Sequence, residues 1–174
     1  MDAFATLAGA LSAKGVSFVV IGVWGANYYA PSGSALMTTL DRDLFLPPDP
    51  ANLLAAWGAC EDAGLALLSG GEPLEKPRDG ALAATVVERR ALTRASDGRG
   101  LEVDLSLVMS GFEFDTVWDS HRVFDAAGIS IPVARLAHIV ESKSVAGRDK
   151  DRLFLETHRA ALQELLAKDA GDRD

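Results

Sequence analysis

The sequence has little cysteine and no long hydrophobic run. Cys60 is the one cysteine among 174 residues, so the chain forms no internal disulfide and no cysteine-based zinc site. It lies within a helical pattern of small and apolar residues, which indicates an inert, buried thiol. The apolar runs are too short to cross a bilayer, and the first residues lack the basic stretch of a signal peptide. We therefore expect a cytoplasmic protein without a membrane-spanning segment.

Positive charge is also scarce. The chain has 17 lysines and arginines against 25 aspartates and glutamates, which gives a formal net charge of −8. Such a chain lacks the broad electropositive surface with which proteins bind long nucleic acids, and its basic residues form at most a localised patch near the C-terminus. With 48% hydrophobic and 24% charged residues, the composition is that of an ordinary globular domain with a sizeable core.

Helical and strand-like hydrophobic patterns alternate along the chain. Helices are predicted at residues 3–14, 25–30, 51–63, 133–146 and 149–168, with a further helical passage at 81–87. Strands are predicted at 17–21, 38–46 and 65–68, and in two hairpins, 91–95 with 101–108 and 123–125 with 129–133. This order predicts an α/β or α+β fold, a small mixed sheet flanked by helices. We divide the chain into an α/β core at 1–132, C-terminal helices at 133–168 and a frayed polar tail at 169–174.

Three aspartates on two of these strands are candidate functional residues. Asp41 and Asp43 stand two positions apart on one strand, so their side chains point to the same face, roughly 6–7 Å apart. Neighbouring carboxylates repel and are costly to desolvate, and a divalent cation such as Mg²⁺ removes both penalties. Asp104, which alternates with apolar residues on a later strand, is the candidate third ligand. The alternative is an ordinary group of surface carboxylates.

A glycine turn follows the first predicted strand. Gly22 to Gly25 links this strand to a short helix, and backbone N–H groups at such a position can bind phosphate. The alternative is a turn that requires glycine for steric reasons alone.

Cationic residues gather near the junction of the last two predicted helices. Lys143, Arg148 and Lys150 form either a solvated helical face or a positive wall that faces phosphate groups. Lys143 is the foremost candidate for a phosphate contact. Asp151 is expected to pair with one of these bases or to cap the last helix.

Most of the chain resembles a known family. A strand, a glycine turn, a short helix and then Thr39-x-Asp41-x-Asp43 on a strand are similar to the nucleotidyltransferase superfamily that includes DNA polymerase β. In that superfamily a third aspartate on a later strand completes the active site, and Asp104 occupies this position here. The resemblance covers roughly residues 15–160.

The C-terminal part carries a second motif of the same family. The helical stretch with Lys143, Arg148 and Lys150 resembles the minimal bacterial nucleotidyltransferases, including the toxins of abortive-infection and toxin–antitoxin systems. The resemblance implies a nucleotidyltransferase-like α/β core with a C-terminal helical extension. It also makes a cognate antitoxin one candidate partner.

The resemblance implies a transferase that moves a nucleoside monophosphate from an NTP such as ATP to a hydroxyl and releases pyrophosphate. Two Mg²⁺ ions would be held by Asp41, Asp43 and Asp104, and Asp104 would also help to deprotonate the acceptor. The acceptor is left open between a tRNA end, a small molecule and a protein side chain. The residues implied in nucleotide binding are Gly22, Val23, Thr39, Lys143, Arg148 and Lys150.

The sequence departs from the family pattern at several positions. Val23 stands where the family usually has glycine or serine, and no arginine stands directly before Thr39. Arg42 lies between the two aspartates, where an apolar residue is usual, on the face that points away from the metals. Val23 and the missing arginine favour an alternative: a catalytically degenerate relative that binds nucleotide or a protein partner.

Overall fold

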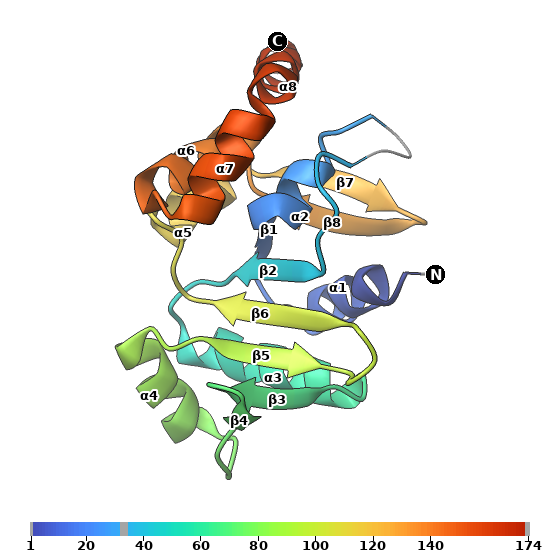
Figure 1. Cartoon of the computed structure of the whole chain (residues 1–174). Helices are drawn as coiled ribbons and strands as arrows, with labels where there is room; N and C mark the ends of the chain where they lie inside the picture. The colour runs from blue at the N-terminus through green and yellow to red at the C-terminus, as the bar shows by residue number, and fades with distance from the viewer. Residues whose placement is uncertain (1, 32–34, 173–174) are drawn as a thin grey trace.

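The computed structural model describes residues 2–31 and 35–172, and one mixed sheet of eight strands lies at its centre (Figure 1). The strands are β1 (Val19–Ile21), β2 (Asp41–Phe45), β3 (Ala66–Ser69), β4 (Glu72–Pro73), β5 (Thr93–Ser96), β6 (Glu102–Ser106), β7 (Arg122–Ala126) and β8 (Ile129–Val133). Their order across the sheet is β4-β3-β5-β6-β2-β1-β8-β7. The pairs β2–β6 and β1–β8 are parallel, and the other neighbours are antiparallel. The predicted α/β class with a mixed sheet is confirmed.

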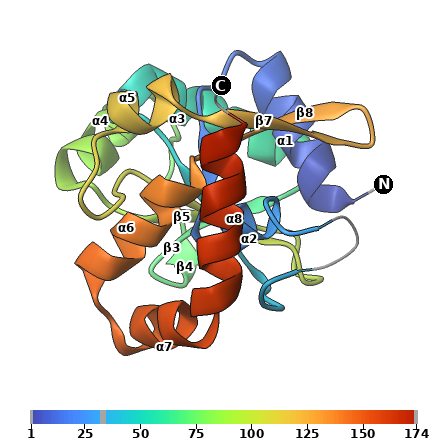
Figure 2. The ribbon, with the colours of Figure 1, turned by 90° about the horizontal axis from the view of Figure 1, so that it is seen from above.

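Helices cover both faces of this sheet. They are α1 (Ala3–Ala13), α2 (Gly22–Asn27), α3 (Pro50–Asp62), α4 (Gly80–Arg89), α5 (Phe114–Asp119), α6 (Leu136–Ala146), α7 (Asp149–Thr157) and α8 (Arg159–Gly171). Figure 2, which looks down from above, shows α1 and α3 on one side of the molecule and α6, α7 and α8 on the other. Within the described residues, the helices are too short or too polar to cross a membrane.

Strict alternation along β5 and β6 separates an apolar face of the sheet from a polar one. Val103 and Leu105 of β6 are fully buried, and Thr93 and Ala95 of β5 lie opposite them. Trp57 of α3 packs on this side, and its indole N–H donates a hydrogen bond to Thr93 Oγ1 at 3.1 Å. The residues in between point to the opposite face, which therefore carries the polar side chains of both strands.

The local signals in the sequence are confirmed. Both predicted hairpins are present as the antiparallel pairs β5–β6 and β7–β8. The pair Asp49-Pro50 is a typical helix start, an N-cap followed by proline, and it begins α3: the carboxylate of Asp49 accepts the N–H of Ala51 at 3.0 Å, and Pro50 fills the first helical position. The helical passage at 81–87 is part of α4.

The predicted bounds of two C-terminal helices were wrong. The helix predicted at 133–146 begins at Leu136, because the chain up to Val133 is paired in β8. The helix predicted at 149–168 is two helices, α7 and α8. They are separated at His158, whose φ of −107° and ψ of 17° leave the helical region.

The tail predicted to fray at 169–174 is instead held in place over its described residues. α8 continues to Gly171, and Asp169 is buried. Its Oδ1 accepts hydrogen bonds from Arg122 of β7 at 2.7 Å and from Arg135, which precedes α6, at 2.9 Å. Two guanidinium partners offset the cost of burying this carboxylate, so the end of α8 is fastened to the β7–β8 hairpin.

Replacing Asp169 with alanine is expected to lower the free energy of unfolding by about 2 kcal/mol, because two partly buried arginines lose their shared acceptor. Asp172→Ala is the matched control. Its carboxylate is exposed and 3.7 Å from Arg122, so a loss below about 0.5 kcal/mol is expected. Urea denaturation followed by circular dichroism measures both. Small, equal losses would show that Asp169 does not fasten α8.

Candidate active site

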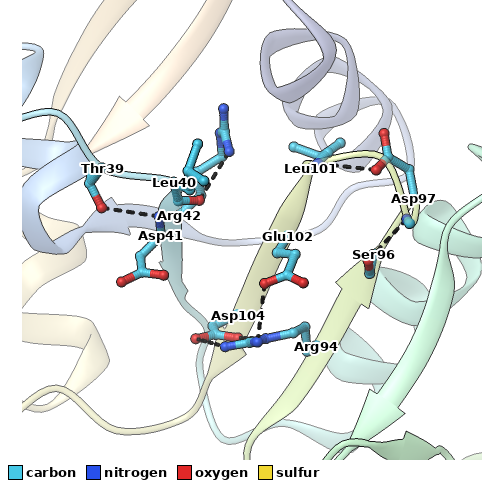
Figure 3. A network of polar contacts seen from close by, with 11 residues as sticks. Thr39, Leu40, Asp41, Arg42, Arg94, Ser96, Asp97, Leu101, Glu102 and Asp104 are labelled. Carbon is cyan, nitrogen blue, oxygen red and sulfur yellow. Dashed lines mark hydrogen bonds and ion pairs between the residues drawn. The ribbon is translucent and has the colours of Figure 1, made fainter.

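The candidate site begins where β2 and β6 run side by side. In this parallel pair Asp41 lies opposite Glu102, and Asp43 lies opposite Asp104. Residues paired in register point to the same face, so all four carboxylates point away from α3. Figure 3 shows Asp41, Glu102 and Asp104 on this common face. The three aspartates singled out in the sequence therefore share one side of the sheet.

A pocket of about 410 Å³ opens on this face, between the sheet and α6. Asp43 and Asp104 line its sheet side, Lys143 lines its helix side, and Gly22 lies at its edge. Asp41 is exposed at the start of β2 and is not among the lining residues. The pocket has the size of a small-ligand site, with acidic groups on one wall and a basic group on the other.

Gly22 lies directly against the carboxylate of Asp43. β1 ends at Ile21, which pairs with Asp43, and α2 begins at Gly22 with a φ of +69°. A Cβ atom at Gly22 would lie 2.8 Å from Asp43 Oδ2. Glycine is therefore required both for the left-handed backbone and for the close approach. The short helix predicted at 25–30 starts three residues earlier than expected, at this turn.

Asp43 is a carboxylate whose ionisation is opposed by its surroundings. Burial comes first, followed by the negative charges of Asp104 and Asp41, and together they raise the pKa of Asp43 to about 6. The positive charges of Lys143 and Lys150 act in the opposite direction. A carboxylate in this position is stabilised by any cation placed beside it.

Asp104 is already paired with a cation, Arg94, which no motif in the sequence indicates. Arg94 of β5 lies opposite it, and its Nε donates to Oδ1 at 2.6 Å while its Nη2 donates to Oδ2 at 3.2 Å. The Nη1 of Arg94 donates to Glu102 Oε2 at 3.2 Å (Figure 3). The hydrogen bond to Asp104 is the main reason why the pKa of Arg94 is raised.

The hairpin that carries Arg94 was predicted, but its register was not. The N–H of Asp97 donates to the carbonyl of Leu101 at 3.1 Å, and this closure places Arg94 opposite Asp104. A two-residue turn at Asp97 and Gly98 would instead place Arg94 opposite Leu101. The register thus depends on the form of the turn, which the sequence left open.

Lys143 reaches the pocket from α6 and is held there by a buried carboxylate. Its Nζ lies 3.5 Å from Asp151 Oδ1 and 4.9 Å from the centre of the Phe154 ring. Burial lowers the pKa of Lys143, although the charge of Asp151 opposes this. Lys150, by contrast, is exposed on α7 and does not line the pocket.

Asp151 has the pairing and capping roles that the sequence predicts. It accepts the backbone N–H of Arg148 at 3.3 Å, and the Nε and Nη2 of Arg148 at 2.7 and 3.2 Å, at the start of α7. Burial acts against its ionisation, but the hydrogen bonds from Arg148 and the charge of Lys143 lower the pKa of Asp151 below its ordinary value. Arg148 borders the pocket, with its Nε and Nη2 already bound to Asp151.

Thr39 and Val23, the other residues implied in nucleotide binding, and Arg42 between the two aspartates have contacts outside the pocket. Thr39 Oγ1 accepts the backbone N–H of Asp41 at 3.0 Å and so shapes the entry into β2. The side chain of Val23 packs against the hydrophobic core. Arg42 points to the other face of β2, as expected, and its guanidinium lies 4.2 Å from the centre of the Trp24 ring.

The carboxylates of the site have the chemistry that suits magnesium, but they do not converge on one position where an ion would bind. Carboxylate oxygens are the ligands that Mg²⁺ prefers, and Asp41, Asp43 and Asp104 offer them on one face. Within residues 2–31 and 35–172, however, no three His, Cys, Asp or Glu side chains lie close enough together to hold a metal ion. Asp104 is bound to Arg94, and Asp41 lies outside the pocket. An ion bound to Asp104 would therefore compete with a guanidinium.

No protein-family model matches the chain, and no curated protein is significantly similar to it. What the pocket can do therefore follows from its own residues.

In metal-free buffer, Asp43→Asn is expected to raise stability above about pH 6 and to change it little near pH 4. The folded-state pKa of Asp43 is about 6 against an ordinary value of 3.8, so the folded protein holds this proton more tightly than the unfolded chain. The wild type thus loses stability as the pH rises from about 4 through about 6, and asparagine removes this loss. A gain on the order of 1 kcal/mol is expected at about pH 8.

Urea denaturation at both pH values measures this effect. Asp119→Asn is the control, because it changes an exposed carboxylate at the end of α5. A gain from Asp43→Asn that is the same at both pH values would contradict the raised pKa.

Proposed function

We propose that the protein is a metal-dependent nucleotidyltransferase, which transfers a nucleoside monophosphate from an NTP to a hydroxyl acceptor and releases pyrophosphate. The observation that carries this proposal is the in-register pairing of Asp43 with Asp104, in a pocket whose opposite wall carries Lys143. Carboxylates suit cations, and the facing ammonium group suits phosphate. The resemblance of Thr39-x-Asp41-x-Asp43 to the nucleotidyltransferase superfamily supports the same function.

The residues of the pocket, together with Asp41 beside it, have proposed roles that follow from their charges. Asp41, Asp43 and Asp104 would hold Mg²⁺, which when bound neutralises phosphate charge and activates the attacking hydroxyl. Lys143 would donate hydrogen bonds to the triphosphate from a position fixed by Asp151. Because Gly22 has no side chain, its backbone can lie against the carboxylate of Asp43, at the edge of the pocket where the donor nucleotide would bind.

The alternative is a catalytically degenerate domain that binds nucleotide or a protein partner, such as an antitoxin. The ion pair between Arg94 and Asp104 favours it, because a guanidinium neutralises this carboxylate without a metal ion. Val23, at a position where the family usually has a smaller residue, points the same way.

Incubation with Mg²⁺, NTPs radiolabelled at the α-phosphate and a lysate of the source organism is expected to label an acceptor. Asp43→Asn and Asp104→Asn should each reduce labelling by at least about a hundredfold, as when a group that stabilises developing charge is removed. Asp119→Asn, outside the pocket, should retain full labelling. The labelled species shows whether the acceptor is a tRNA, a small molecule or a protein.

Isothermal titration with NTP and Mg²⁺ distinguishes the active transferase from the degenerate binding domain. Metal-dependent binding that is lost in Asp41→Ala and Asp43→Ala supports the enzyme. Nucleotide binding that is indifferent to both substitutions, together with no labelled acceptor, would support the degenerate domain.

A further inference from the structure

The acidic face of the sheet includes one cation to which the proposed transfer reaction gives no role. The guanidinium of Arg94 binds both oxygens of Asp104, through two parallel hydrogen bonds of 2.6 and 3.2 Å. This fork-to-fork geometry uses the same carboxylate oxygens that a metal ion would need. A divalent ion on these oxygens would lie next to the guanidinium, and the two positive charges would repel each other strongly. Arg94 and a divalent ion therefore compete for Asp104.

Arg94 can leave Asp104 without leaving the acidic face. Its side chain is 39% exposed, whereas that of Asp104 is 18% exposed, so the arginine lies on the solvent side of the pair. Its Nη1 already donates to Glu102, which lies two residues before Asp104 on β6 and pairs with Asp41 of β2. The charges of Glu102 and Asp41 both contribute to the raised pKa of Arg94. A second acceptor for the guanidinium is therefore in place.

We propose that Arg94 occupies the cation position on Asp104 and is displaced onto Glu102 when a divalent ion binds, so that Arg94 sets the metal affinity of the pocket. This inference rests on the proposed function, because it takes Asp43 and Asp104 to be metal ligands. Arg94 is then a positioning residue: it orients the carboxylate of Asp104 through two hydrogen bonds, and the incoming ion displaces it. This exchange accounts for the observation that, among the described residues, the carboxylates are not gathered around one point as metal ligands would be.

Manganese binding, followed by electron paramagnetic resonance of free Mn²⁺, tests this exchange without a measurement of activity. Arg94→Gln removes the competitor and is expected to lower the Kd for Mn²⁺ about tenfold, which corresponds to about 1.4 kcal/mol. Arg99→Gln is the matched control, because it removes the same charge from the exposed turn of the same hairpin. It should change the Kd by less than about twofold, as expected for a screened surface charge.

Asp43→Asn separates failure of the exchange from failure of the metal site. If Arg94→Gln binds Mn²⁺ no more tightly than the wild type does, while Asp43→Asn abolishes binding, the displacement is wrong and the metal site stands. If the wild type binds no Mn²⁺, or if binding is indifferent to Asp43→Asn, the proposed function fails and the exchange fails with it.

A second measurement uses the wild type and so does not depend on how a variant folds. The Nε–H group of Arg94 gives its own NMR signal, which Arg94→Gln identifies by its loss. Saturation with Mg²⁺ should shift this signal in the wild type and leave it unchanged in Asp43→Asn. A signal that stays in place in the wild type at saturating Mg²⁺ would overturn the displacement.

Discussion

The parallel pairing of β2 with β6 is the constraint on which the candidate site depends. Val103 and Leu105 are fully buried, and burial of each such side chain stabilises the fold by about 1.5–3 kcal/mol. A slip of β6 by one residue would expose both and turn Asp104 toward α3, into the apolar layer. The core therefore fixes the register that sets Asp104 beside Asp43, so the geometry of the acidic face follows from hydrophobic burial rather than from any attraction among the acids.

The charges on this face are balanced from two directions. Arg94 reaches along the sheet to Asp104, whereas Lys143 approaches from α6 on the opposite wall of the pocket. Each is tied to its own carboxylate, Asp104 for the arginine and Asp151 for the lysine. Asp43 has neither as a direct partner among the described ion pairs, and its burial and the charges of Asp104 and Asp41 raise its pKa. The resulting charge asymmetry makes Asp43 the carboxylate of the pocket that is stabilised most by a new cation.

The parts of the fold that the sequence predicted depend on local chemistry. The cap at Asp49, the two hairpins and the common face of Asp41 and Asp43 follow from residues within a few positions of each other. The parts that it missed depend on distant partners. Asp169 finds its two arginines 34 and 47 residues away, and Arg94 meets Asp104 only through a turn whose form was open.

Asp151 of α7 does not line the pocket, but it links α7 to the pocket through its ion pair with Lys143. Lys143 projects from α6, yet the carboxylate that compensates its buried charge comes from α7, and the same carboxylate caps the start of α7 through Arg148. The loss of Asp151 would leave an ammonium group in an apolar setting beside Phe154, and the loss of Lys143 would leave a buried anion with less compensation. In related chains, the residues at positions 143 and 151 should therefore change together. Covariation between these two positions would identify relatives that keep this pocket even where the aspartates of the sheet have been replaced.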